Sequence, residues 1–256
     1  MKKAIVVALV VILVPVLALV GALVGAFAGS RPLVDATELP GGARLVKDGI
    51  VSAYVLPAGD GVALIDCGND VKGGAILAEL ARRHLTAEAV KAVFLTHAHG
   101  DHTAGCHLFP KAEVMAFEGD VGLAAGTSHS KGLIPTLMGN LAVERRVGVT
   151  RTLKDGEEVA VGPLTVRAYA TPGHTSGSAG YLANGVLYLG DSANGASDGT
   201  LKAAPWIFSD DTAQNRASLK ALAARLKADG VTVQMMAFAH SGPLDGMGAL
   251  EAFRGE

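Results

Sequence analysis

The feature that most constrains how this chain can fold is a cluster of histidines and one aspartate that directly follows an apolar run. Residues 92–95 read Ala-Val-Phe-Leu, and residues 96–102 read Thr-His-Ala-His-Gly-Asp-His. The apolar run predicts a buried strand, so we expect the cluster in a loop at the end of that strand. Imidazole nitrogens and carboxylate oxygens are ligands of divalent metals, most commonly zinc. Because only 8 of the 256 residues are histidine, three of them within six positions predict a metal site.

The spacing within the cluster indicates that one loop serves two metals. His97 and His99 alternate along an extended segment and point to one side, whereas Asp101 and His102 can turn to the other. Three further strand-like runs end in a residue of the same chemistry, and these residues are His174, Asp191 and His240. A Pro-Gly pair before His174 predicts the turn that presents its ring. Four strand ends that carry candidate ligands predict one constellation.

Together these motifs resemble those of the metallo-β-lactamase-fold hydrolase superfamily, over about residues 43–253. The matching motifs are Leu64-Ile65-Asp66-Cys67-Gly68, the 97–102 cluster, the 171–177 turn, Gly190-Asp191-Ser192 and His240. The resemblance is to the glyoxalase II-like and lactonase-like branches, and the motifs do not select one subfamily. It implies an α+β fold, a four-layer αββα metallo-β-lactamase-like sandwich in residues 43–256, with metals at one edge between two sheets.

The resemblance also implies a role for each candidate residue. The implied ligand sets are His97, His99 and His174 for one zinc ion, and Asp101, His102 and His240 for a second, with Asp191 and a hydroxide bridging them. Iron or manganese are the alternatives to two Zn²⁺ per chain. Asp101 is the candidate catalytic residue, because it can orient the hydroxide and deliver a proton. Asp66 is expected to support a ligand, since ligating imidazoles usually donate their second N–H to a carboxylate or carbonyl.

The expected activity is metal-dependent hydrolysis of a small-molecule ester, thioester or lactone. A metal lowers the pKa of bound water to about 7, so no serine or cysteine nucleophile is needed. One alternative is a mononuclear-iron, persulfide dioxygenase-like oxidoreductase, which shares the fold and much of the histidine pattern. A second alternative is phosphodiesterase or β-lactamase activity. The number of bound metals distinguishes these activities: one iron per chain indicates the dioxygenase, and two zinc-like ions indicate hydrolysis.

Three sequence features bear on the substrate. Glyoxalase II carries a long helical C-terminal region that binds glutathione, whereas 16 residues follow His240 here. Many lactonases place a tyrosine three residues after the bridging aspartate, where this chain has Asn194. β-Lactamases usually lack a bridging aspartate at the position of Asp191.

The net charge of −2 predicts no basic surface, so no nucleic-acid partner is expected. No oligomeric state is predicted.

The N-terminus predicts a membrane or signal segment over residues 1–29. Two lysines precede residues 4–28, which contain no charged residue. This run is longer than the 7–15-residue core of a cleaved signal peptide and suits a transmembrane helix. The lysines favour an orientation that places the catalytic domain outside the cytoplasm. The alternative is a secreted or periplasmic chain after cleavage near Ala28. Residues 30–42 are expected to be a linker.

Two further expectations concern parts of the chain beside the cluster. For Cys67 and Cys106 we expect two buried free thiols, with a disulfide or metal ligation by Cys106 as alternatives. For residues 118–149 the hypothesis is a mobile flap over an apolar part of the substrate, with His129 near the entrance. The equally weighted alternative is a short helix packed on the core. A helix is also expected from an aspartate cap at Asp210 or Asp211 through about Ala228.

Overall fold

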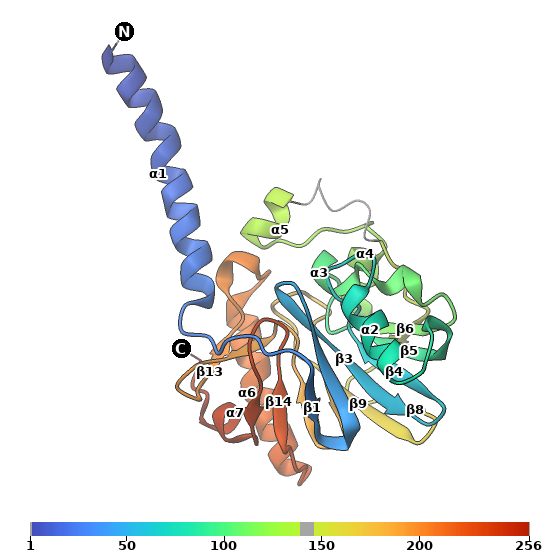
Figure 1. Cartoon of the computed structure of the whole chain (residues 1–256). Helices are drawn as coiled ribbons and strands as arrows, with labels where there is room; N and C mark the ends of the chain where they lie inside the picture. Colours follow the sequence, from blue (N-terminus) through green and yellow to red (C-terminus); the bar gives the residue numbers. More distant parts are fainter. Residues whose placement is uncertain (1, 139–145, 256) are drawn as a thin grey trace.

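Two β-sheets packed face to face form the centre of the computed structural model (Figure 1), which describes residues 2–138 and 146–255. The first sheet has the order β1-β2-β3-β4-β5-β6-β7, and the second has the order β15-β14-β11-β10-β9-β8. One buried cluster, which includes Tyr54, Phe94 and Tyr181, lies between the sheets. A second cluster joins the first sheet to its outer helix, and a third joins the second sheet to two more. The four-layer αββα prediction is therefore confirmed.

The first sheet is antiparallel in its first half and parallel in its second. Its strands are β1 (Thr37–Leu39), β2 (Ala43–Asp48), β3 (Val51–Ala58), β4 (Gly61–Ile65), β5 (Val90–Phe94), β6 (Glu113–Phe117) and β7 (Arg151–Leu153). The pairs β4–β5, β5–β6 and β6–β7 are parallel. Every residue of β4 is buried, because helices cover one face and the second sheet covers the other. The carboxyl ends of the parallel strands therefore meet at one edge.

The second sheet is antiparallel except for one pair. Its strands are β8 (Glu158–Val161), β9 (Leu164–Ala170), β10 (Ala179–Ala183), β11 (Val186–Tyr188), β14 (Met235–Ala237) and β15 (Leu244–Asp245). The parallel pair is β11–β14. A separate ribbon pairs β12 (Ala193–Gly195) with β13 (Leu201–Ala203). The Tyr181 hydroxyl of β10 donates to the Leu95 carbonyl at 2.7 Å, which joins the second sheet to the start of the histidine loop.

The helices cover the outer faces of the sheets. Those on the first sheet's side are α2 (Gly74–Arg82), α3 (Gly100–Thr103) and α4 (Glu118–Ala124), and those on the second are α6 (Thr212–Ala228) and α7 (Gly248–Ala252). The carboxylate of Asp211 accepts the Gln214 backbone N–H at 2.9 Å, which confirms the predicted cap of α6. Leu219, Leu222 and Leu226 bury the inner face of this helix.

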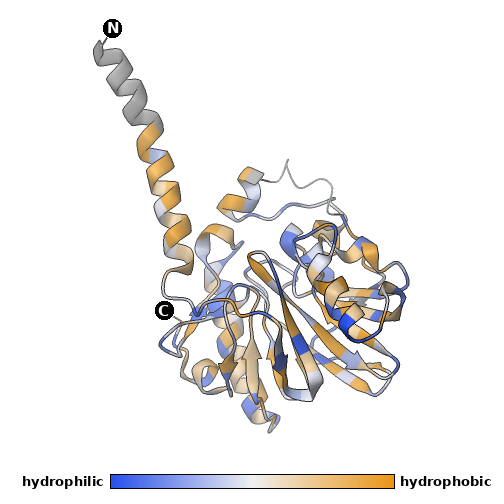
Figure 2. Ribbon diagram, in the orientation of Figure 1, coloured by the Kyte–Doolittle hydropathy of each residue, from blue (hydrophilic) through white to orange (hydrophobic). Residues whose placement is uncertain are grey.

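The N-terminal segment forms the helix α1 (Lys2–Phe27), which projects away from the sandwich (Figure 1). Its described side chains are largely apolar and exposed (Figure 2). Within the residues that the structure describes, no helix has the length and apolar character needed to cross a membrane. The side chains of residues 1–12, which the anchor prediction also needs, lie outside the described residues.

Residues that the sequence assigned to a linker take part in the sandwich. The strand β1 pairs antiparallel with β2, from Thr37 opposite Leu45 to Leu39 opposite Ala43. Ser30 forms an isolated bridge with Ala196 beside the β12–β13 ribbon. The difference arises because a three-residue edge strand is too short to show a periodic pattern in the sequence.

The expectation of two free thiols is wrong, because Cys67 and Cys106 form a disulfide with their Cα atoms 5.2 Å apart. The Cys67 backbone N–H donates to the His102 carbonyl at 2.7 Å, so the loop after β4 lies against the end of α3. This backbone contact brings together the two cysteines, which are 39 residues apart in the sequence. Metal ligation by Cys106 is excluded by the same bond.

The segment expected to be a flap contains α4 and a second short helix, α5 (Leu133–Met138). Leu133 and Leu137 keep 43% and 62% of their surface exposed, so these two side chains do not pack on the core. The Ser130 hydroxyl and the Lys131 backbone N–H both donate to Asp210 at 2.6 Å, which ties the start of α5 to the loop before α6. Leu141, part of the predicted apolar pattern, lies outside the described residues. The flap hypothesis stays a prediction.

Candidate metal centre

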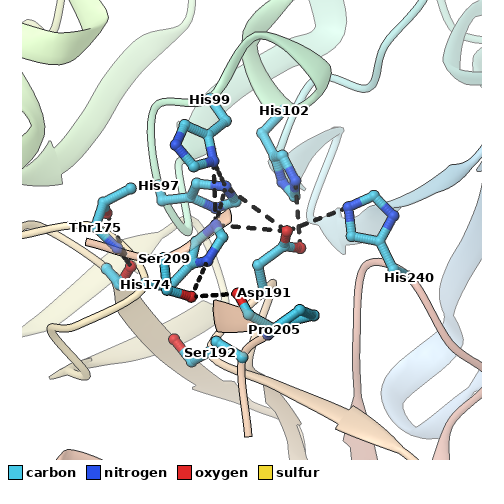
Figure 3. Close-up of polar contacts among 12 residues, drawn as sticks. His97, His99, His102, His174, Thr175, Asp191, Ser192, Pro205, Ser209 and His240 are labelled. Atoms are coloured by element: carbon cyan, nitrogen blue, oxygen red, sulfur yellow. Dashed lines mark hydrogen bonds and ion pairs between the residues drawn. The ribbon is translucent and has the colours of Figure 1, made fainter. Parts of the chain in front are cut away.

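Ends of strands from both sheets bring the seven predicted ligands together at one edge of the sandwich. Figure 3 labels all of them except Asp101. The loop after β5 carries His97 and His99, and α3 carries the next two ligands of the cluster. His174 lies in the turn between β9 and β10, Asp191 follows β11, and His240 follows β14. The ligand atoms form overlapping groups in which all atoms lie within 4.8 Å of one another. The predicted constellation is thus assembled from segments as far apart as residues 97 and 240.

Three imidazoles form one end of this centre, which we call the trihistidine side. His97 Nε2 lies 3.1 Å from His99 Nδ1, and His174 Nε2 lies 3.2 Å from His97 Nε2 and 3.1 Å from His99 Nδ1. Ligands of tetrahedral zinc at 2.0–2.1 Å are themselves separated by about 3.3 Å. Three ring nitrogens at nearly this mutual separation match the face of a metal tetrahedron.

Carboxylates dominate the other end, which we call the acid side and define as Asp101, His102 and His240 with Asp191. Asp101 Oδ2 lies 3.3 Å from His240 Nε2 and 3.8 Å from His102 Nε2. The Asp191 carboxylate lies against the same two rings, with Oδ1 3.4 Å from His102 Nε2 and Oδ2 3.2 Å from His240 Nε2. Two anionic groups around two imidazoles give a second set of hard and borderline ligands.

Asp191 also reaches the trihistidine side. Its Oδ2 atom lies 3.5 Å from His174 Nε2 and 4.0 Å from His97 Nε2. Among the described residues, the buried atoms Asp191 Oδ1 and His102 Nε2 have no hydrogen-bond partner. Buried polar atoms without a partner are costly, and a bound cation would satisfy both. The donor groups on both sides therefore fit metal ions, and the Asp191 carboxylate lies between the two sides.

Residues 46–240 match the family model described as the metallo-beta-lactamase superfamily. The chain belongs to that superfamily. A hydroxyacylglutathione hydrolase of Brucella anthropi is 35% identical over 108 residues, which are 42% of this chain and 33% of the relative. Ribonuclease TTHA0252 of Thermus thermophilus is 32% identical over 164 residues, which are 57% of this chain and 36% of the relative. The chain thus matches about a third of the length of these two curated relatives.

The solved structures support the same fold. The subclass B3 metallo-beta-lactamase BJP-1 of Bradyrhizobium japonicum superposes with a TM-score of 0.60 over 83% of this chain and 79% of its own, at 22% identity. Identity this low shows the fold alone. The hydroxyacylglutathione hydrolases among the curated relatives confirm the resemblance to the glyoxalase II-like branch of the metallo-beta-lactamase superfamily.

The pKa values of the histidines separate the two sides of this metallo-beta-lactamase-like centre. Burial lowers the pKa of His174 to about 3. Burial, followed by repulsion from His102 and His174, holds the pKa of His97 well below its ordinary value. Burial also opposes the charged form of His240, but the Asp191 and Asp101 carboxylates outweigh it and raise the pKa of His240 to about 10. Near pH 7 the metal-free trihistidine side is therefore neutral, whereas His240 carries a proton.

Hydrogen bonds to the outer nitrogens hold the ligand rings in place. His102 Nδ1 lies 2.8 Å from Asp66 Oδ2, which confirms the supporting role expected for Asp66. The backbone N–H of Thr96 donates to the other oxygen of this carboxylate at 2.7 Å. Asp66 adopts a left-handed backbone conformation with φ +59°, which turns its side chain back toward the histidine loop. His240 Nδ1 donates to the Ile50 carbonyl at 2.8 Å.

The sequence interpretation missed two residues that support the trihistidine side. Asp120 is fully buried and accepts three hydrogen bonds, from Ala98 N at 2.7 Å, Thr175 Oγ1 at 2.9 Å and Gly177 N at 2.7 Å. It therefore joins the loop of His97 and His99 to the turn of His174. Its sequence signal is weak, since it lies three residues after the end of β6 on the edge where the ligands meet. The second is Ser209, whose Oγ lies 3.2 Å from His174 Nδ1.

Proposed function

We propose that this chain is a dinuclear metal-dependent hydrolase that binds two zinc ions and cleaves an ester, thioester or lactone of a small molecule. The observation that carries the proposal is the position of Asp191, whose carboxylate lies within 3.5 Å of His174 and within 3.4 Å of both His102 and His240. A carboxylate between two ligand sets suits a pair of ions rather than one. Hydroxyacylglutathione hydrolases among the relatives support the thioester class.

When bound, such ions lower the pKa of water to about 7 and polarise the oxygen of the scissile group. The remaining tasks fall to the chain itself. Asp101 is the candidate base, because its side chain keeps 26% of its surface exposed while its Oδ2 faces His240. Burial opposes ionisation of this carboxyl, but His102 and His240 outweigh it and hold its pKa below the ordinary range. Asp101 is therefore ionised near pH 7 and can accept a proton from water at Oδ2.

Metal analysis of the purified full-length chain, followed by a substrate panel, tests this proposal. We expect about two zinc ions per chain and hydrolysis within the ester, thioester and lactone members of the panel. A phosphodiester and a β-lactam complete the panel and test the alternative hydrolases. One iron per chain together with oxygen consumption on a persulfide would contradict the dinuclear proposal in favour of the dioxygenase-like alternative. The exposed Asp198 provides a matched control, since its replacement by alanine should leave metal content unchanged.

We further propose that α1 anchors the chain in a membrane and places the hydrolase outside the cytoplasm. The uncharged run of residues 4–28 behind two lysines supports the anchor and its orientation. The Cys67–Cys106 disulfide supports an oxidising compartment, where such bonds persist. Membrane fractionation, protease accessibility and N-terminal sequencing test both parts. A soluble mature chain that begins at Gly29 would remove the anchor and leave export intact.

A further inference from the structure

Large apolar side chains are exposed on segments that pack beside the metal centre or against one another. We call this group the apolar rim, and its members are Val24, Ile50, Leu133, Leu137 and Trp206. Their exposed fractions range from 43% for Leu133 to 68% for Val24. Exposed apolar side chains that gather beside a site mark a surface that meets an apolar partner.

Each part of the rim is connected to a metal ligand or its support. Ile50 receives the hydrogen bond from His240 Nδ1, at 2.8 Å. The ring of Phe27, at the end of α1, lies 5.5 Å from the His240 ring and 5.9 Å from the Phe208 ring. Trp206 belongs to the same short 3-10 helix as Phe208, namely η4 (Trp206–Phe208). The helix η4 ends beside Ser209, which contacts His174 Nδ1.

The helix α5 completes the rim on the other side of η4. A Cβ atom at Gly132 would lie only 2.6 Å from the Phe208 carbonyl carbon, so the backbone before α5 packs directly on η4. Figure 1 shows α1 and α5 on the same side of the sandwich, and Figure 2 shows apolar residues along both. The rim therefore continues from the apolar helix α1, across η4, to α5.

The base of α1 is attached firmly to the catalytic domain. Lys202 Nζ donates to the Ala28 carbonyl at 2.7 Å, and Ser197 N donates to the Gly29 carbonyl at 2.8 Å. The Arg31 N–H donates to the Gly195 carbonyl at 2.8 Å. If α1 inserts, this attachment leaves no flexible linker that could move the rim away from the membrane surface.

We propose that the apolar rim rests in the interface of the bilayer that holds α1, and that the metal centre takes an amphiphilic ester from that bilayer. The acyl chain of the substrate would lie along the rim while its ester group reaches the ligands. Water adds to the acyl carbon, the bond to the alcohol oxygen breaks, and that oxygen takes the proton that the water loses. Trp206 is 60% exposed and is the chain's only tryptophan, and tryptophan is enriched at membrane interfaces. The ester part rests on the proposed hydrolase function, and the membrane contact rests on the proposed α1 anchor.

The fluorescence of Trp206 tests the membrane contact without any measurement of activity. The full-length chain is reconstituted into phosphatidylcholine and phosphatidylglycerol vesicles, with and without brominated acyl chains. We expect at least a twofold loss of Trp206 emission with brominated lipid and weak quenching by aqueous iodide. In a Trp206→Phe, Val71→Trp variant, the single tryptophan lies before α2 and outside the rim, so iodide should quench it and brominated lipid should not.

Three results would overturn the docking proposal. The first is a chain that does not remain with the vesicles. The second is quenching of Trp206 by iodide and not by brominated lipid, which would show a rim that faces water. The third is protection of Trp206 from both quenchers, which would show that protein, such as a second copy of the chain, covers the rim.

Chain-length dependence tests the substrate class separately. We expect Trp206→Gln to lower the ratio of kcat/KM for a dodecanoyl ester in vesicles to kcat/KM for a soluble acetyl ester by about tenfold. Val71→Gln, at an apolar residue outside the rim, should not change this ratio. An unchanged ratio in Trp206→Gln would overturn the amphiphilic substrate. If the unmodified chain hydrolyses neither ester, the proposed ester hydrolysis fails, and the lipid-quenching result still decides the docking.

Discussion

The trihistidine side of the metal centre is mostly buried and neutral, whereas its acid side is charged and partly faces solvent. The side chain of His97 is 1% exposed and that of His174 is fully buried, whereas that of Asp101 is 26% exposed. Burial lowers the pKa of His174 to about 3, and two carboxylates raise the pKa of His240 to about 10. A metal can therefore enter the trihistidine side without displacing a proton, but it must displace at least one on the acid side.

This difference assigns different tasks to the two sides. Neutral, buried nitrogens favour a permanently held ion, because the ligands are already in their binding form. The acid side has the partly exposed Asp101 and the protonated His240, so we expect this side to meet the substrate. We expect the ion on the trihistidine side, the first ion, to be bound more tightly than the ion on the acid side, the second ion. The predictions below test this order, from the largest effect to the smallest.

Replacement of Asp191 by alanine should have the largest effect, because this carboxylate alone lies between the two sides. The variant keeps three protein ligands on each side but loses the group that screens the repulsion between two cations. We expect it to fold, to lose most of the second metal, and to lose more than about 10⁴-fold in kcat. Metal analysis and single-substrate kinetics measure both effects, with Asp198→Ala as the exposed-carboxylate control. Two metals and a near-native rate would contradict the bridging position.

The pH dependence of metal binding should differ between the sides. With a metal-free pKa of about 10, His240 is protonated below that pH and must release its proton when a metal binds. The carboxylates around His102 outweigh its burial and raise its pKa well above the ordinary value as well, so this ring can release a second proton. Affinity on the acid side should therefore fall at least about tenfold for each unit that the pH drops, or at least about 100-fold from pH 8 to pH 6. His174, with a pKa of about 3, is already neutral over this range, so the trihistidine side should change little. Chelator competition at pH 6, 7 and 8 measures both affinities. If the affinities of the two sides change equally with pH, the difference in protonation between the sides is wrong.

Each of two matched variants should weaken metal binding on one side of the centre. Asp120→Asn removes a carboxylate that supports the trihistidine loops, and Asp66→Asn removes the one that holds His102. Outer partners of metal ligands typically contribute 10–100-fold in affinity, so we expect losses of that size, each on its own side. Stepwise metal titration of the two variants measures the pattern. If both variants weaken the same ion, the assignment of the two supporting carboxylates is wrong.

Removal of the disulfide should have the smallest effect on the metals and a clear effect on stability. Cys67 follows Asp66 directly, and Cys106 lies four residues after His102, so the bond braces the acid side. For a separation of 39 residues, we expect the Cys67→Ala, Cys106→Ala variant to lose about 3–4 kcal/mol in the free energy of unfolding. We expect about threefold weaker binding of the second metal only. Urea unfolding and metal titration measure these values. Weaker binding of the ion on the trihistidine side would contradict the inference that the disulfide braces the acid side.

Local patterns in the sequence identified most of the metal centre and its scaffold. Three histidines and an aspartate in six positions, placed after an apolar run, already indicated the metal loop, and the structure brings all seven predicted ligands together. The sequence likewise predicted the cap of α6 at Asp211, because the capping side chain and the N–H that donates to it are only three residues apart. In each case the informative residues are close in sequence or follow a strand whose pattern is visible.

Only the tertiary structure decided which distant residues support those ligands. Asp120 joins two ligand loops, but its three hydrogen bonds go to groups 22 to 57 residues away, and nothing in its local sequence marks them. The partner of Cys67 and the contact of Phe27 with His240 depend in the same way on chain segments brought together by folding. Periodicity reports which face of an element is buried, whereas the identity of the neighbour across that face depends on how the layers pack.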